Sequence, residues 1–142
     1  MSEQNIPSSG SNNQYMLSKW AALFALQAAL SVAAGAFGAH ALTAILDAKA
    51  LGWWHTASQY LMYHALAGLL VVALFSFLSS CKRVLILFFL GNVFFAGSLY
   101  IMALTGLTYL GAVTPIGGFC YLLAWCLLAV SLWRSPSIKS KF

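Results

Sequence analysis

Acidic side chains are nearly absent from this sequence. Glu3 and Asp47 are the only carboxylic acids among its 142 residues. Glu3 lies in a polar segment near the N-terminus, and Asp47 precedes AKAL, a position typical of a helix N-cap. Glycoside hydrolysis, carboxylate metal sites and carboxylate proton relays each need acidic groups close together. The composition therefore excludes these chemistries, and we expect a protein that is not an enzyme.

Cysteine is also scarce and is not arranged for binding. Cys81, Cys120 and Cys126 are odd in number, and no two of them form a CxxC pair. This pattern supports neither a disulfide framework nor a zinc site. Phosphate-binding and dinucleotide-binding glycine motifs are absent as well, so we expect no cofactor.

Charge of either sign is rare, and hydrophobic residues dominate. Only 6% of the residues are charged and 62% are hydrophobic, whereas about a quarter of a typical soluble domain is charged. Lipid must therefore be the solvent for most of the chain. The predicted segments are a disordered polar tail over 1–18, a four-helix transmembrane domain over 19–134 with helices at about 19–40, 48–79, 84–104 and 114–133, and a basic tail over 135–142.

The first apolar run has one alternative interpretation, a cleaved signal peptide. Lys19 precedes the run, and the small residues of AAGAFGA resemble a cleavage site. The uncharged run over 20–39 is longer than the 7–15 apolar residues of a usual signal peptide. We therefore expect this run to be a transmembrane helix.

The basic residues predict an orientation. Four spans place six of them on the side of the termini, and only Lys49 on the other side. The positive-inside rule then places both termini in the cytoplasm. The basic residues are scattered, so they predict no nucleic-acid partner. The six are Lys19, Lys82, Arg83, Arg134, Lys139 and Lys141.

Small residues are expected to pack the helices. Lipid tails are as apolar as leucine, so transmembrane helices associate through close backbone approach and interhelical hydrogen bonds. An all-α, integral membrane four-helix bundle is the predicted fold. The glycines expected at helix contacts are Gly35, Gly38, Gly97, Gly117 and Gly118.

Polar side chains gather in the second predicted helix. His55, Gln59 and Tyr63 are spaced by four residues and so share one face. These groups could bond across helices, or they could line a pocket for a small molecule, a lipid headgroup or a proton. The candidate polar core or ligand-facing residues are His40, Gln59, Tyr63, His64 and Asn92.

A metal site is not expected among the histidines. His55 and His64 are nine residues apart, which places them on opposite sides of one helix at 100° per residue. His40, at the outer end of the first helix, could approach either one, but a third ligand is missing.

Four motifs in order resemble one family. They are GAFGAHAL (Gly35–Leu42), QYxxYHAL (Gln59–Leu66), AGSLYIMALTG (Ala96–Gly106) and VTPIGG (Val113–Gly118). Together they are similar to the YgdD-like family of small inner-membrane proteins, over roughly residues 18–133. One departure is Asp47-Ala48-Lys49, where relatives have a Ser-Pro-Glu-like helix start. The resemblance implies a multi-pass protein of the bacterial inner (plasma) membrane, without established activity and without catalytic residues.

These observations favour a non-enzymatic accessory or interaction component of the membrane. Its expected partners are the lipid bilayer and either a second copy or another membrane protein. The alternative is a small-solute or ion transporter or channel that uses a polar core around Gln59, His64 and Asn92. A membrane enzyme that uses His40 or His64 is disfavoured by the lack of carboxylates.

Overall fold

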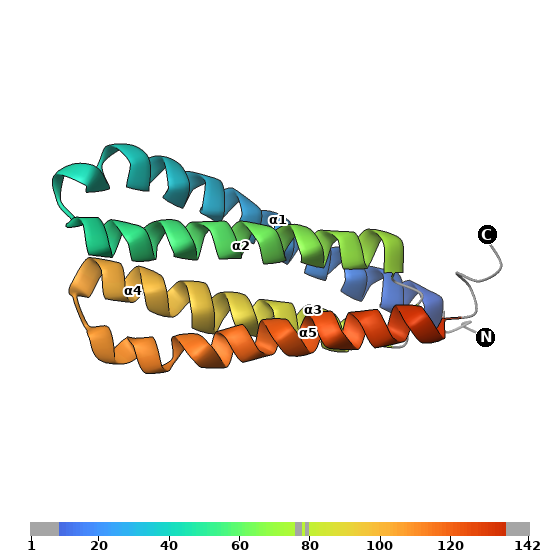
Figure 1. Ribbon diagram of the computed structural model, residues 1–142. Helices are drawn as coiled ribbons and strands as arrows, with labels where there is room; N and C mark the ends of the chain where they lie inside the picture. The colour runs from blue at the N-terminus through green and yellow to red at the C-terminus, as the bar shows by residue number, and fades with distance from the viewer. Residues whose placement is uncertain (1–8, 76–77, 79, 136–142) are drawn as a thin grey trace, which may run out of the picture.

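In the described part of the chain, four apolar helical spans form a bundle of two helical hairpins (Figure 1). One pairs α1 (Ser9–His40) with α2 (Ala48–Phe75), and the other pairs α3 and α4 (Cys81–Gly91 and Gly97–Thr105) with α5 (Thr114–Arg134). The computed structural model describes residues 9–75, 78 and 80–135, and these ranges contain no strand. Each span is long and apolar enough to cross a membrane. The spans are Gln14–His40, Ala48–Leu74, Cys81–Thr105 and Thr108–Arg134. The predicted fold class, an all-α membrane bundle, is confirmed.

The third span is interrupted by a π-helical segment. A π turn holds one more residue than an α turn, so it changes which side chains face inward, and such turns often occur at functional sites. The elements are α1 (Ser9–His40), η1 (Leu42–Ala44), α2 (Ala48–Phe75), α3 (Cys81–Gly91), the π-helical η2 (Asn92–Ala96), α4 (Gly97–Thr105), η3 (Thr108–Ala112) and α5 (Thr114–Arg134).

Local chemistry sets two of these boundaries. The Asp47 carboxylate accepts a hydrogen bond from the Ala50 backbone N–H at 2.7 Å, which is the N-cap that the sequence predicts for α2. Gly106, with φ of 72°, ends α4 in the left-handed conformation that glycine adopts readily.

The expected disordered tail over 1–18 is wrong for residues 9–18, because α1 begins at Ser9. The hydrophobic Leu17 packs on the core, and the Lys19 ammonium lies 4.3 Å from the centre of the Tyr15 ring one turn away. These contacts stabilise helix in a segment whose composition is polar. Other parts of the predicted tails and of the second predicted helix, residues 1–8, 76–77, 79 and 136–142, lie outside the described residues.

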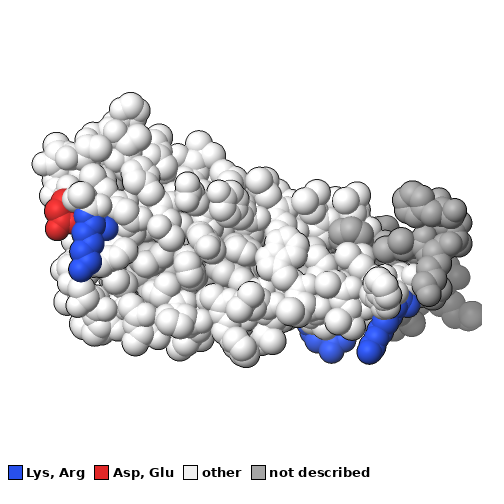
Figure 2. Space-filling view, in the orientation of Figure 1, with Lys and Arg blue, Asp and Glu red and all other residues white. Residues whose placement is uncertain are grey.

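Charged side chains lie at the two ends of the bundle. Figure 2 shows Lys and Arg at both ends and an uncharged surface between them. α1 begins and α5 ends at the same end of the bundle (Figure 1). An uncharged middle flanked by charged ends is the surface expected of a membrane-spanning protein.

Close helix contacts depend on four glycines. An added Cβ at Gly38 would lie 2.6 Å from the Trp54 ring, and one at Gly68 would lie 2.6 Å from the Phe24 ring. An added Cβ at Gly91 would overlap the Tyr121 ring, and one at Gly117 would overlap the Phe95 backbone. These four positions therefore allow α1, α2, the third span and α5 to approach one another.

Three of the expected packing glycines do not make such close contacts. An added Cβ at Gly35 or Gly97 would meet nothing within 4 Å, and at Gly118 it would make only ordinary contact with the Phe95 ring at 3.9 Å. Gly97 has this room because it lines an open groove, whose other side is formed by Gln27, Leu30 and Ala34 of α1. The expectation for Gly35 and Gly97 is therefore wrong.

Candidate functional site

Asn92 lies at the centre of a buried polar cluster. Its Nδ2 donates a hydrogen bond to Gln27 Oε1 at 2.9 Å, and its Oδ1 accepts one from the Tyr121 hydroxyl at 2.8 Å. All three residues are buried, and they come from α1, the start of η2 and α5. We name Gln27, Asn92 and Tyr121 the amide–tyrosine cluster. It ties three of the four spans together.

His64 adds the fourth span to this cluster. Its ring stacks on the Tyr121 ring with centroids 3.4 Å apart and planes inclined by 7°. His64 Nδ1 lies 2.8 Å from the Tyr60 carbonyl oxygen. A carbonyl oxygen only accepts, so Nδ1 carries the hydrogen and a neutral ring leaves Nε2 as an acceptor. The cluster and His64 therefore form one connected arrangement across the bundle.

The structure places Gln59 and Tyr63 outside this arrangement. Both side chains are exposed on the outer surface of α2, and Tyr63 is 58% exposed. Gln59 precedes His64 by five residues, which is about 140° around a helix, so both cannot point inward. The expected core of Gln59, Tyr63, His64 and Asn92 is thus wrong for its first two members.

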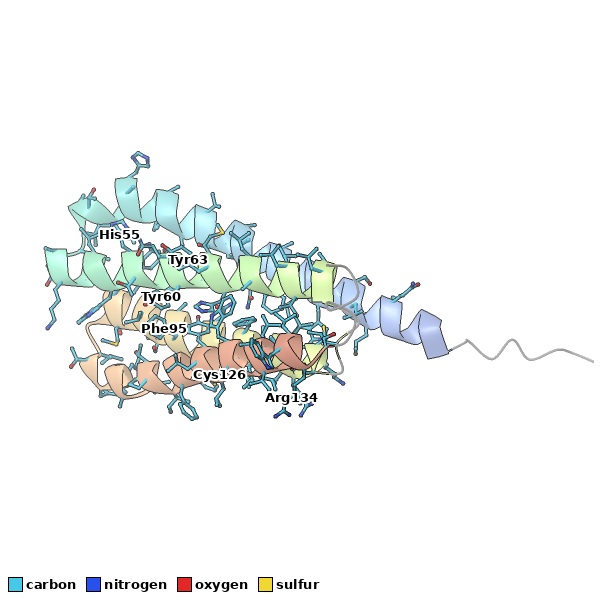
Figure 3. All side chains as sticks on the ribbon, turned by 45° about the vertical axis from the view of Figure 1, so that its right-hand side comes forward. His55, Tyr60, Tyr63, Phe95, Cys126 and Arg134 are labelled. Carbon is cyan, nitrogen blue, oxygen red and sulfur yellow. The ribbon has the colours of Figure 1, made fainter. Side chains whose placement is uncertain are left out.

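Figure 3 separates the two sides of α2. Tyr60 lies beside Phe95, with ring centroids 4.6 Å apart, on the side that faces the third span and α5. His55 and Tyr63 lie on other parts of the helix surface, and both are exposed.

His40 is also exposed, at the outer end of α1, and does not join the polar cluster. Across the described residues, no group of three or more His, Cys, Asp or Glu side chains is placed to hold a metal ion. The three cysteines are free, with Cys81 buried and Cys126 exposed. The expected inward position of His40 is therefore wrong. Ser31 donates its hydroxyl hydrogen to the Ser58 carbonyl on α2, and His40, nine residues further along, lies on the opposite side of α1.

Sequence reasoning missed Gln27 and Tyr121. The signal for Gln27 was available, because it is the one amide within the uncharged run over 20–39. Trp54 is also buried, and its Nε1 donates to the Ala34 carbonyl at 2.7 Å. Its ring also contacts Tyr100 edge-on, with centroids 4.6 Å apart. An amphipathic ring can satisfy its N–H inside a bundle as well as at an interface.

Two grooves open beside the polar cluster. The α1–α4 groove has a volume of about 380 Å³ and is lined mainly by apolar side chains, with Gln27 and Asn92 among its residues. The α2–α5 groove, of about 570 Å³, is bordered by Tyr60, His64 and Tyr121. Both volumes lie within the range of about 300–1,000 Å³ that is typical of small-molecule sites.

The apolar surface, the four spans and the buried polar cluster define a multi-pass α-helical membrane protein. Comparison with known proteins gives the family. The sequence model of the family described as "Protein of unknown function (DUF423)" matches residues 34–118, and the chain belongs to this family.

Curated relatives agree with this assignment. The UPF0382 membrane protein YwdK of Bacillus subtilis is 45% identical over 113 residues, which cover 77% of this chain and 91% of that protein. The UPF0382 membrane protein SSP2132 of Staphylococcus saprophyticus is 45% identical over 114 residues, with 79% and 94% covered. The UPF0382 inner membrane protein YgdD of Escherichia coli is 38% identical over 128 residues, with 84% and 93% covered.

No solved structure matches the chain. The relatives are named as membrane proteins, and the one from Escherichia coli as an inner membrane protein. Together with the four apolar spans, these names place the chain in the bacterial inner (plasma) membrane as a multi-pass protein. The resemblance to the YgdD-like family is confirmed.

Proposed function

We propose that the protein is a non-enzymatic interaction component of the membrane and that it associates through the exposed face of α2. We name His55, Gln59 and Tyr63 the α2 polar face. The observation that carries the proposal is the exposure of Gln59 and Tyr63 on a membrane span. A polar group that faces hydrocarbon has no water to bond with, so it requires a partner from another molecule.

The depth of these two residues supports this requirement. Leu61 is the midpoint of the span Ala48–Leu74, and Gln59 and Tyr63 each lie two residues from it. Two residues correspond to about 3 Å along a helix, whereas the hydrocarbon core extends about 15 Å on either side of its centre. Both residues therefore lie inside the hydrocarbon core. Only a shift of α2 along the membrane normal by most of the half-thickness of that core would move them out.

The first partner that we propose is a second copy of the chain. The Gln59 amide carries two donor hydrogens and one acceptor oxygen. In a two-fold symmetric pair the same surface is used on both subunits. Two Gln59 side chains across such an axis could therefore form reciprocal hydrogen bonds, with each bond contributing about 0.6 kcal/mol or more.

Measuring self-association in liposomes tests this function. Fluorescence energy transfer between labelled copies of the full chain would report the dimer. Gln59→Leu keeps the side-chain size and removes the amide, so we expect dimerisation about tenfold weaker. Val32→Leu, on the exposed surface of α1, is the matched control and should change nothing. A wild-type chain that stays monomeric, or a Gln59→Leu chain that dimerises equally well, would reject the proposal.

The transport alternative has less support. It relied on a shared polar core of Gln59, His64 and Asn92, but Gln59 is exposed on the outside of α2. Asn92 uses its amide in bonds to Gln27 and Tyr121. Solute flux into proteoliposomes would be the direct measurement, and substantial flux would favour a transporter over an interaction component.

For the orientation, we propose that both termini face the cytoplasm. The support is the positive-inside rule applied to the basic residues at the end of the bundle where α1 begins and α5 ends. A C-terminal reporter that is active only outside the cytoplasm would reverse this orientation.

A further inference from the structure

The α1–α4 groove contains a hydrogen-bond donor that the bundle does not use. We propose that this groove binds a small apolar molecule from the bilayer, a ketone or a quinone, whose carbonyl oxygen accepts a hydrogen bond from Gln27 Nε2. The site is distinct from the α2 polar face, so the proposal goes beyond self-association and does not depend on it.

The unused donor follows from the bonding of Gln27. The residue is only 8% exposed, and its Oε1 accepts the hydrogen bond from Asn92. Among the described residues, no hydrogen-bond partner contacts its Nε2. In the described chain, every side-chain nitrogen or oxygen that is fully enclosed has a hydrogen-bond partner. Because Gln27 Nε2 has no partner, it is not fully enclosed and must border open space. Gln27 lines the α1–α4 groove, so this groove is the open space.

The depth of Gln27 restricts the ligand. Gln27 is the midpoint of the span Gln14–His40, so it lies near the centre of the bilayer. Phospholipid ester groups lie outside the hydrocarbon core, about 15 Å from its centre. A donor at the centre therefore selects a molecule that dissolves in the core and carries its own acceptor there. A ketone or quinone meets both conditions.

The walls of the groove fit such a molecule. Leu30, Ala34, Val93 and Gly97 form apolar walls, and the volume is about 380 Å³. The polar groups near its outer end are already engaged: Trp54 Nε1 donates to the Ala34 carbonyl, and the Tyr100 hydroxyl is 2.9 Å from Ser58 Oγ. An apolar cavity with a few placed polar groups is typical of a small-molecule site.

Photolabelling with benzophenone tests the proposal. Benzophenone is an apolar diaryl ketone that forms covalent bonds with nearby C–H groups on irradiation. With the full chain in proteoliposomes, we expect its label on peptides that contain the groove residues of α1, η2 and α4. Gln27→Leu removes the donor and should reduce this labelling about fivefold, the change typical of one lost hydrogen bond.

A second variant keeps the test valid if Gln27→Leu fails to fold. Gly97→Leu should fill the groove, and it should fold because an added Cβ at Gly97 meets nothing within 4 Å. We expect it to lose most of the labelling. Gly35→Leu is the matched control, since Gly35 has equal space around its Cβ and does not line the groove. Labelling that Gly97→Leu leaves unchanged, or that spreads evenly over the spans, would overturn the proposal.

Competition identifies the chemistry of the ligand. A long-chain methyl ketone and a decyl-substituted benzoquinone should each reduce the labelling more than an alkane of the same length. Stronger competition by the benzoquinone would assign a quinone, and stronger competition by the methyl ketone would assign a simple ketone. Equal competition by the alkane would show that the carbonyl is not recognised and would overturn the proposal. None of these outcomes changes with the dimerisation of the chain, so the two proposals fail separately.

Discussion

Gly117 and Gly118 are adjacent in α5, but the same substitution should have opposite effects at the two positions. An added Cβ at Gly117 would lie 2.8 Å from Phe95 Cα and 2.7 Å from Phe95 Cβ, and it would overlap the Phe95 backbone nitrogen. An added Cβ at Gly118 would meet only the Phe95 ring, at 3.9 Å. The first contact involves backbone within η2, which cannot rotate away, and the second is an ordinary contact.

Two opposing effects, helix propensity and overpacking, determine whether alanine raises or lowers the stability at each position. Replacing glycine by alanine in a helix stabilises it by about 1 kcal/mol, and overpacking a well-packed site costs about 1–3 kcal/mol. At Gly117 the obstacle is backbone, so we expect the upper end of that cost and a net loss of about 2 kcal/mol. At Gly118 no clash opposes the gain in helix propensity, so we expect the free energy of unfolding to rise by up to about 1 kcal/mol.

Reversible unfolding in mixed detergent micelles measures both variants under the same conditions. The free energies of unfolding of Gly117→Ala and Gly118→Ala should differ by about 3 kcal/mol, with Gly118→Ala the more stable. Equal stability of the two variants would show that α5 does not approach η2 as closely as the structure indicates.

Two further substitutions test side-chain hydrogen bonds by the same measurement. Asn92→Leu should destabilise the bundle by about 1–3 kcal/mol, because it leaves Gln27 Oε1 and the Tyr121 hydroxyl without partners. Adding Gln27→Leu to this variant should lower the free energy of unfolding by less than Gln27→Leu does in the wild-type chain. Trp54→Phe should cost about 1 kcal/mol, because it removes the 2.7 Å bond to the Ala34 carbonyl and keeps an aromatic ring; a loss below about 0.3 kcal/mol would contradict that bond.

The sequence predicts the spans well because insertion depends on local properties. Length and hydropathy act within one helix, and so does the Asp47 cap. In the third span, Asn92, Ala96 and Leu99 recur at helical spacing, and all three are buried. Spacing therefore shows which residues share a face of one helix.

The direction in which each face points was harder to predict. Spacing places Gln59 and Tyr63 together on α2, but it does not show whether that face meets another helix or lipid. Gln27 can be recognised in the sequence as the one amide of its apolar run, but its partner Asn92 is 65 residues away and no spacing within one helix connects the two. These contacts depend on how complete helices pack, and such packing is not encoded in the pattern of a single helix.

The two sets of polar residues illustrate how this bundle acquires specificity. Apolar helices in lipid pack almost equally well in several registers, because hydrocarbon and leucine offer similar contacts. Gln27, Asn92 and Tyr121 bond correctly in one arrangement only, so the cluster fixes the register of α1, the third span and α5. Gln59 and Tyr63 belong to the same chemical class but find no such arrangement within the described chain. The same physics that sets the fold inside the bundle should therefore operate at the α2 polar face between molecules, where it would select a partner.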